Sequence, residues 1–212
     1  MKKITALLMS LAMAHGIALA QAKLSPKEIL DRTANLMQVQ GGISAKFTTT
    51  TFIGTTPNET ISGTLEMLGN KYVMSTPAIQ TWFNGKEQWT LMPDNKEVNL
   101  VTPTDEELQV ASPTAFLTLY KQGFNISSNN NMLRGRKIWD ITLRPKKRSQ
   151  EPSRIVVSID QENFAPLCLR IRNEGNWTRI SITDLNFNAG LSDASFQFPA
   201  QKYPDYEVID MR

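Results

Sequence analysis

Histidine is almost absent from this sequence. The only one is His15, in an N-terminal segment that we expect to be removed from the mature chain. Without histidine a protein lacks Ser-His-Asp and Cys-His catalytic arrangements, His-ligated zinc and His-based acid–base catalysis. The absence argues against an ordinary hydrolase, whereas chemistry based on carboxylates or lysine stays open.

Cysteine is equally scarce. Cys168 is the single cysteine, so no internal disulfide can form. Its place in an alternating apolar segment predicts a small buried side chain rather than a reactive thiol. We also expect no metal and no cofactor.

Neither sign of charge dominates. The sequence has 23 Lys and Arg against 20 Asp and Glu, a formal net charge of +3. Without Lys2 and Lys3 the balance is 21 against 20, which gives no case for nucleic acid as a partner. The densest basic run is Arg144-Pro145-Lys146-Lys147-Arg148. It is either a docking patch for an acidic partner or anionic lipid headgroups, or a solvated hairpin tip.

Long hydrophobic runs are missing except at the N-terminus. Residues 1–22 have a Lys2-Lys3 start, an apolar run to Ala20 and small residues at the expected cleavage site, which is typical of a secretory signal peptide. The alternative is a membrane anchor, although the run is near the short end for a span of about 20 residues. We expect residues 23–212 to be exported as a single soluble domain. The cleavage region contains no cysteine, so we do not expect the mature chain to carry a lipid anchor.

A helix is predicted directly after this segment. Ser25-Pro26-Lys27-Glu28 combines an N-cap, a proline suited to the first helical position and a capping box. Apolar residues then follow at helical spacing, namely Ile29, Leu30, Thr33, Leu36 and Met37. Gly41-Gly42 is expected to end an amphipathic helix of about three turns that packs on a sheet.

The remainder of the chain favours antiparallel strands. Alternating segments predict them at 43–53, 61–68, 71–75, three within 80–101, 124–127, 137–143, 154–160, 167–172, 177–187 and 196–199, with a possible last strand in 203–212. Asn84-Gly85 predicts a type I′ hairpin turn, and Pro93-Asp94-Asn95 a second turn. Residues 55–58 are expected to turn, and 128–132 to form a polar connection.

The strand pattern stops at Pro103. Thr104-Asp105-Glu106-Glu107 and Ser112-Pro113 predict the starts of two short helices, the second very apolar up to Tyr120. These helices are either plain core or a movable lid. The acidic residues 105–107 suit a helix dipole better than the paired carboxylates of a glycosidase, so we do not expect an enzyme.

These elements predict a mainly β, α+β fold. A twisted sheet of this size curls. We therefore expect a strongly curved antiparallel sheet that forms an unclosed half-barrel, with the leading helix and short lid helices on the concave side.

Several short motifs add a family resemblance. The segment Asn84-Gly85-Lys86-Glu87-Gln88-Trp89-Thr90-Leu91-Met92-Pro93 fits an Asp-Gly-Lys-x-x-Trp-x-x-x-Pro pattern. Ser44–Thr48, Ser112–Leu117 and Phe196–Pro199 fit a first-strand entry, the start of a central helical insertion and a late Phe-x-Phe-x-Pro ending. In this order, over nearly all of the mature chain, the motifs resemble those of the LolA-type periplasmic carriers of outer-membrane lipoproteins.

The resemblance implies a periplasmic, non-enzymatic carrier, and a monomer is expected. Its apolar cavity would take the acyl chains of lipoproteins from an inner-membrane ABC-type exporter and pass them to an outer-membrane acceptor. In the family an arginine holds the lid closed, but Gly69 stands at that position here. The alternative is a carrier or sensor of another lipid or glycolipid with the same architecture.

The candidate lipid-binding residues are apolar residues of the strands and of the predicted lid. The strand residues are Phe47, Leu65, Met67, Trp82, Trp89, Leu91, Ile141, Leu143 and Val157, and the lid residues are Phe116, Leu117 and Tyr120. For each of them the alternative is an ordinary place in the core.

Overall fold

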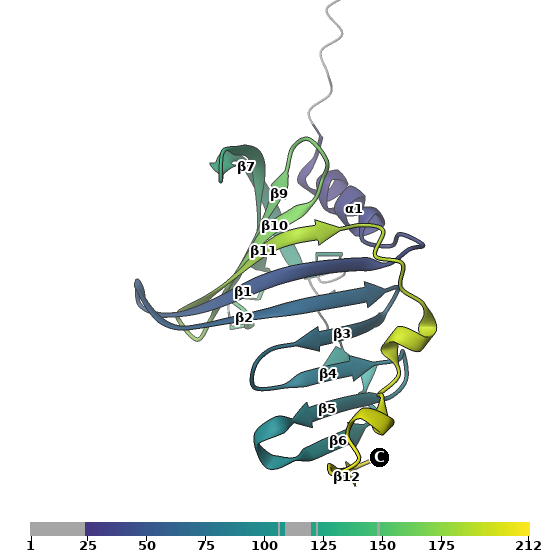
Figure 1. The fold of residues 1–212 in the computed structure, drawn as a ribbon. Helices are drawn as coiled ribbons and strands as arrows, with labels where there is room; N and C mark the ends of the chain where they lie inside the picture. The colour runs from purple at the N-terminus through teal and green to yellow at the C-terminus, as the bar shows by residue number, and fades with distance from the viewer. Residues whose placement is uncertain (1–23, 106, 109–119, 122, 148) are drawn as a thin grey trace, which may run out of the picture.

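Among the residues that the structure describes, twelve strands form one continuous sheet, and one long helix lies against one of its faces (Figure 1). The computed structural model describes residues 24–105, 107–108, 120–121, 123–147 and 149–212. Among these residues no helix has the length and apolar character needed to cross a membrane.

The elements follow one another with short connections over most of the chain. The helix is α1 (Pro26–Leu36), and the strands are β1 (Ile43–Ile53), β2 (Thr56–Leu68), β3 (Lys71–Ser75), β4 (Gln80–Phe83), β5 (Gln88–Met92), β6 (Glu97–Val101), β7 (Phe124–Leu133), β8 (Arg136–Pro145), β9 (Arg154–Asp160), β10 (Pro166–Asn173), β11 (Asn176–Asn186) and β12 (Glu207–Asp210).

The sheet consists of two antiparallel meanders. The order is β12-β6-β5-β4-β3-β2-β1-β11-β10-β9-β8-β7, so β11 returns beside β1 and joins the meanders β1–β6 and β7–β11. β12 pairs in parallel with β6, and β12 and β7 are the two edges. Because the edges do not pair with each other, the predicted unclosed half-barrel is confirmed.

The predicted start of α1 is confirmed in detail. Glu28 N donates to Ser25 Oγ at 3.2 Å, and Ser25 N donates to Glu28 Oε2 at 2.7 Å, which completes the capping box. The side chains of Ile29, Leu30 and Thr33 are buried, as the helical spacing predicts. The helix ends earlier than predicted, at Leu36, and the chain turns toward β1 through Gly42, which has φ 71°.

The hairpin at Asn84-Gly85 is confirmed, but its predicted type I′ turn is wrong. The loop spans four residues between β4 and β5, and Asn84 acts through its side chain, whose Oδ1 accepts from the backbone of Lys86 and Glu87. Turns with positive φ at both central residues occur instead at Arg134-Gly135 and Glu174-Gly175. The side-chain carbonyl of Asn84 thus stabilises a four-residue loop, where the Asn-Gly pair predicts a two-residue turn.

Two strand boundaries differ from the sequence-based expectation. β2 begins at Thr56, so the chain reverses at Gly54 and Thr55 rather than over 55–58; Pro57 lies at a register shift opposite Phe52. β7 continues through 128–132, where a polar connection was expected. Polar side chains are compatible with this strand because it is an edge with one unpaired side.

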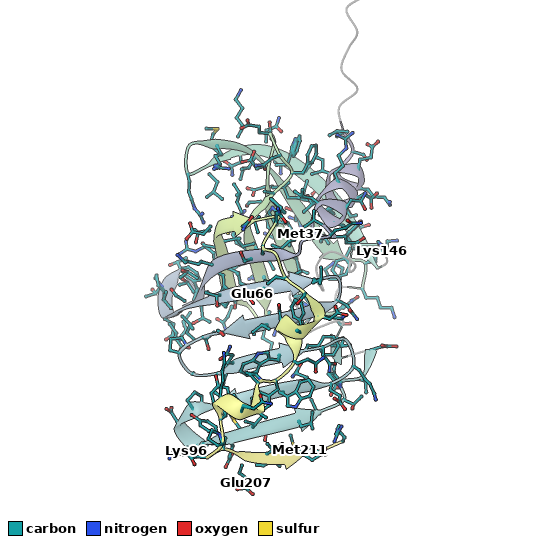
Figure 2. All side chains as sticks on the ribbon, turned by 45° about the vertical axis from the view of Figure 1, so that its right-hand side comes forward. Met37, Glu66, Lys96, Lys146, Glu207 and Met211 are labelled. Carbon is teal, nitrogen blue, oxygen red and sulfur yellow. The ribbon has the colours of Figure 1, made fainter. Side chains whose placement is uncertain are left out.

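The C-terminal segment also departs from expectation. Residues 196–199 form no strand: Phe196 ends a 3₁₀ helix, Asp193–Phe196, and the chain then continues to β12, which lies within the range 203–212 of the possible last strand. Figure 2 shows this segment in yellow as it passes across the strands of the first meander. We call this side of the sheet the opposite face, and the side that packs against α1 the helix-bearing face.

The capping box gives a first prediction. Ser25→Ala should lower the free energy of unfolding by about 1 kcal/mol, because the Glu28 N–H loses its acceptor. Urea denaturation would measure the change. Ser149→Ala, at an exposed serine in the loop before β9, is the control and should change stability little. Equal stability of the two variants would contradict the role of Ser25.

Candidate functional site

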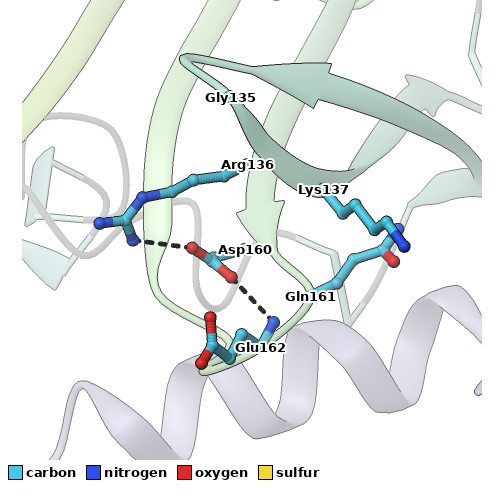
Figure 3. Close-up of a pocket in the computed structure, with 6 residues that line it drawn as sticks. All are labelled: Gly135, Arg136, Lys137, Asp160, Gln161 and Glu162. Carbon is cyan, nitrogen blue, oxygen red and sulfur yellow. Dashed lines mark hydrogen bonds and ion pairs between the residues drawn. The ribbon is translucent and has the colours of Figure 1, made fainter.

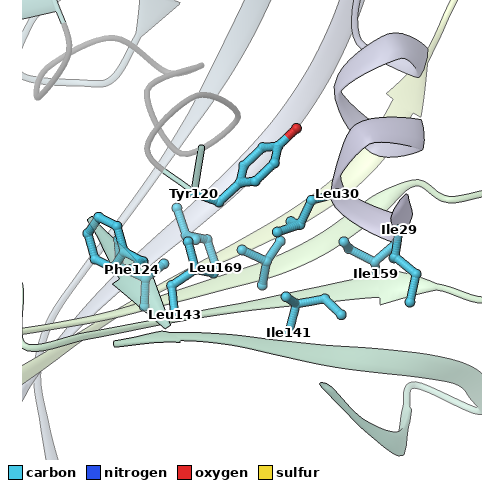
Figure 4. Packing of buried hydrophobic residues seen from close by; sticks show 10 residues of the cluster. Ile29, Leu30, Tyr120, Phe124, Ile141, Leu143, Ile159 and Leu169 are labelled. Carbon is cyan, nitrogen blue, oxygen red and sulfur yellow. The ribbon is translucent and has the colours of Figure 1, made fainter. Parts of the chain in front are cut away.

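Two buried apolar clusters lie on the helix-bearing face. The first joins α1 to the second meander and consists of Ile29, Leu30, Tyr120, Phe124, Ile141, Leu143, Ile155, Val157, Ile159 and Leu169 (Figure 4). The second lies on the first meander and consists of Met37, Ile43, Met67, Tyr72 and Phe83, with Leu65 and Leu108 packed against it. Four candidate residues, Tyr120, Ile141, Leu143 and Val157, thus lie together in the first cluster.

A strip of partly exposed apolar side chains lies between these clusters. Phe47 pairs with Ile182 on β11 and with Gly63 on β2, which places it on the same face as Leu65 and Met67. The strip consists of Phe47, Ile61, Leu65, Ile180 and Ile182, all partly exposed. The strands β1, β2 and β11 therefore offer apolar surface at the centre of this face.

Gly63 explains the position of the Phe47 ring. A Cβ on Gly63 would lie 2.6 Å from Phe47 Cζ and 2.3 Å from the Ser75 carbonyl oxygen. Only a residue without a side chain fits between the ring and the neighbouring strand. The ring can therefore lie over the backbone of β2 within the strip.

Three candidate residues lie on the other side of the sheet. Trp82, Trp89 and Leu91 occupy the opposite face and pack under the C-terminal segment, with Phe196, Phe198 and Tyr203. The rings of Trp82 and Phe198 meet edge to face, with centroids 5.3 Å apart. The structure therefore does not bring these three residues together with the other candidates. Successive side chains of a strand point to opposite faces, so these positions on β4 and β5 point away from the helix-bearing face.

The predicted lid helices are only partly within the described residues. Glu107 N donates to Thr104 Oγ1 at 3.3 Å, and Thr104 N donates to Glu107 Oε2 at 2.8 Å, as expected for a helix start. Phe116 and Leu117 lie outside the described residues. β6 lies next to one edge strand of the sheet, and β7 is the other edge strand. Of the described residues between these strands, Leu108 packs against the second cluster and Tyr120 belongs to the first.

Tyr120 is tied to α1 by a hydrogen bond to a carboxylate. Its hydroxyl donates to Asp31 Oδ1 at 2.5 Å, and Lys27 Nζ lies 2.8 Å from Asp31 Oδ2. Hydrogen bonds from Lys27 and Tyr120 lower the pKa of Asp31, whereas burial and the Asp31 carboxylate raise the pKa of Tyr120. This contact fastens the end of the β6–β7 connection to the helix.

Gly69 offers no comparable contact. It lies in the turn between β2 and β3 with φ 62°, and no atom lies within 4 Å of where a Cβ would be. The family's arginine has no side-chain equivalent at this position. Tyr120 and Asp31 were not singled out as a pair from the sequence, because residues 89 positions apart meet only through the fold.

The basic run remains exposed where it is described. Arg144, Lys146 and Lys147 lie at the end of β8 and the turn that follows, and Arg148 is outside the described residues. The backbone N–H of Lys146 donates to the Gly123 carbonyl. These three side chains are therefore accessible to solvent, as both interpretations of the run require.

A shallow polar depression of about 370 Å³ lies at the turn ends of β8 and β9 (Figure 3). Its lining is charged, and the buried Asp160 carboxylate accepts from Arg136 Nη1 at 2.9 Å and from Glu162 N at 2.8 Å. These bonds lower its pKa against the effect of burial. The depression therefore does not suit an apolar ligand. In the part of the chain that the structure describes, no cluster of His, Cys, Asp and Glu is arranged to hold a metal.

An open sheet with a helix on one face and apolar surface between two clusters is suited to holding apolar ligands. Residues 17–176 match the family described as outer membrane lipoprotein carrier protein LolA, and the chain belongs to this family. The resemblance seen in the sequence is thereby confirmed. No curated protein sequence matches the chain.

Solved structures are similar to this chain at low sequence identity. An uncharacterized conserved protein from Thermus thermophilus has a TM-score of 0.59 at 15% identity, over 87% of this chain and 98% of that one. A LolA superfamily protein from Nitrosomonas europaea has a TM-score of 0.43 at 12% identity, over 83% and 99%. A putative outer membrane lipoprotein-sorting protein domain from Vibrio parahaemolyticus has 0.46 at 12%, over 82% and 96%.

The Tyr120–Asp31 contact gives a second prediction. Tyr120→Phe should destabilise the protein by about 1.5 kcal/mol at neutral pH, because a hydrogen bond to a charged, partly exposed carboxylate is lost. Since the folded state lowers the pKa of Asp31, its stabilisation is present above about pH 4 and is lost as pH falls through the folded-state pKa. The difference between wild type and variant should therefore shrink in acid.

Denaturation with urea at neutral and acidic pH would measure this difference. Tyr72→Phe is the matched control, because the Tyr72 hydroxyl donates to the neutral Gln88 Oε1 at 2.8 Å. The loss of unfolding free energy caused by Tyr72→Phe should be the same at neutral and acidic pH. A Tyr120→Phe effect of equal size at both pH values would contradict the contact with Asp31.

Proposed function

We propose that this protein is a periplasmic carrier that binds the acyl chains of lipoproteins and moves them from the inner to the outer membrane. The observation that carries this proposal is the partly exposed apolar strip on β1, β2 and β11. Membership of the lipoprotein-carrier family supports it. Phe47 and Leu65 of the strip are the proposed contacts, with Met67 of the second cluster and the candidate residues of the first cluster on either side of the strip.

The energetics of acyl binding favour an incompletely enclosed site. Full burial contributes roughly 0.8 kcal/mol per CH₂, so one long acyl chain would gain about 12 kcal/mol. Affinity of that order would slow release greatly. Because the strip lies on an open sheet, an acyl chain bound there would bury only part of its surface. Weaker binding of this kind suits a protein that must hand over its cargo.

The partners belong to the proposal as well. An inner-membrane ABC-type exporter would load the carrier, and an outer-membrane acceptor would unload it. Phe116 and Leu117 remain predicted contacts of the acyl chain. No catalytic step is proposed, since holding and releasing an acyl chain changes no covalent bond.

The decisive experiment identifies the bound molecule. The protein would be isolated from its native compartment and the co-purifying species identified by mass spectrometry. Acylated lipoproteins would support the proposal. A phospholipid or glycolipid would keep the apolar site and assign another cargo, and a ligand-free protein that also takes up no fatty-acyl probe would overturn it.

A third prediction locates the site. Phe47→Gln combined with Leu65→Gln should weaken binding of a fluorescent fatty-acyl probe at least about tenfold, because both apolar contacts are lost. Thr48→Gln combined with Thr64→Gln is the matched control, since these residues lie on the same strands and point to the opposite face. Equal affinities of the two double variants would contradict the proposed site.

A further inference from the structure

Four arginines lie together on the opposite face of the second meander. Arg170 on β10 pairs directly with Arg179 on β11, and Arg172 on β10 lies between Arg154 on β9 and Trp177 on β11. Directly paired residues of antiparallel strands share a face, so two neighbouring cross-strand rows are positively charged. We call Arg154, Arg170, Arg172 and Arg179 the arginine cluster.

The described residues neutralise this cluster only at one corner. Arg170 Nη2 lies 3.1 Å from Asp140 Oδ1, but among the described residues Arg154, Arg172 and Arg179 form no ion pair. Asp140 also accepts from Ser158 at 2.6 Å and from Asn131 at 2.8 Å. Like charges directly opposite each other destabilise a sheet. The fold therefore bears a cost here that an anionic partner would remove.

Aromatic rings orient two of the guanidinium groups. Arg154 Cζ lies 6.0 Å from the centroid of the Trp177 ring, and Arg179 Cζ lies 5.2 Å from that of Phe52. The Nε atoms of Arg170 and Arg172 are buried and have no hydrogen-bond partner in the part of the chain that the structure describes. The cluster thus stands on central strands with restricted side chains, and its planar donors are arranged before any partner binds.

The positive charge extends toward the turn between β7 and β8. Arg134 Nη1 from this turn donates to the Ile182 carbonyl of β11 at 2.9 Å. Burial raises the pKa of the Cys168 thiol on the same face, and the charges of Arg170, Arg179 and Arg134 oppose that effect. By contrast, the nearby Lys46 is paired with Asp184 at 2.9 Å. Among the described residues on this face of the second meander, the unneutralised positive charge around the cluster therefore comes from arginines.

We propose that the arginine cluster is a docking surface for an acidic segment of a partner protein. Arginine forks bind carboxylates in a bidentate manner, and interface centres are rich in arginine and tryptophan but poor in lysine. Trp177 beside Arg172 and a cluster of arginines without lysine favour a protein partner over a lipid surface. This surface is distinct from the apolar strip, so it stands or falls independently of acyl binding.

The test compares two charge-matched double variants of the full chain. The probe is a fluorescently labelled peptide of alternating Glu and Gly, and its anisotropy is measured at about 50 mM and about 200 mM salt. Arg154→Gln with Arg172→Gln should weaken binding about tenfold, and Lys86→Gln with Lys96→Gln, at exposed turn residues of the first meander, should leave it within about twofold. Wild-type binding should weaken at the higher salt concentration.

Two further measurements separate specific docking from general charge. Arg154→Lys with Arg172→Lys keeps the charge but loses the planar guanidinium fork. Its affinity for the peptide should therefore be lowered about as much as that of Arg154→Gln with Arg172→Gln. The thermal midpoint of Arg154→Gln with Arg172→Gln should equal or exceed that of the wild type, since the repulsion between the two paired arginines is removed. Equal losses in both Gln double variants would overturn the proposal. Failure of the wild type to bind the peptide would also overturn it. The same holds if the wild type binds phosphatidylcholine–phosphatidylglycerol vesicles through these arginines but does not bind the peptide.

Discussion

The pairing of β1 with β11 is the contact on which the rest of the structure depends. It joins two meanders that are each local in sequence, with Phe47 opposite Ile182 and Thr51 opposite Thr178. Each meander alone would leave an additional unpaired edge, at β1 or at β11. Joining them places Phe47 and Leu65 beside Ile180 and Ile182, and so creates the apolar strip. The same pairing brings Arg179 beside the aromatic ring of Phe52 on the other face.

The two faces of the sheet have different coverings. On the helix-bearing face α1 covers much of the second meander, where Ile29 and Leu30 are almost completely buried at 1% and 0% exposure. On the opposite face, the C-terminal segment covers the first meander and buries Trp82. Neither covering extends over the whole sheet. The apolar strip and the arginine cluster lie on opposite faces around β11, so the proposed cargo and the proposed protein partner would bind independently.

Much of the fold follows from local patterns in the sequence. The capping box predicts α1, and alternation places Ile61, Gly63, Leu65 and Met67 on one face of β2, because these signals act between near neighbours. The errors arose where a polar group or an edge changed the local rule. Asn84 closes a four-residue loop with its side chain, and β7 tolerates polar residues because one of its sides has no partner. Apolar character alone likewise assigned Trp82 and Trp89 to the cavity.

The sequence by itself determined the class of fold and the family, since both depend on element order and short motifs. It also determined which side chains alternate within each strand. Only the tertiary structure decided which alternating sets share a face. It placed Trp82 under Phe198, Tyr120 against Asp31, and Arg172 between Arg154 and Trp177. The physical reason is that strand pairing fixes register between segments far apart in the chain, and a local pattern carries no information about that register.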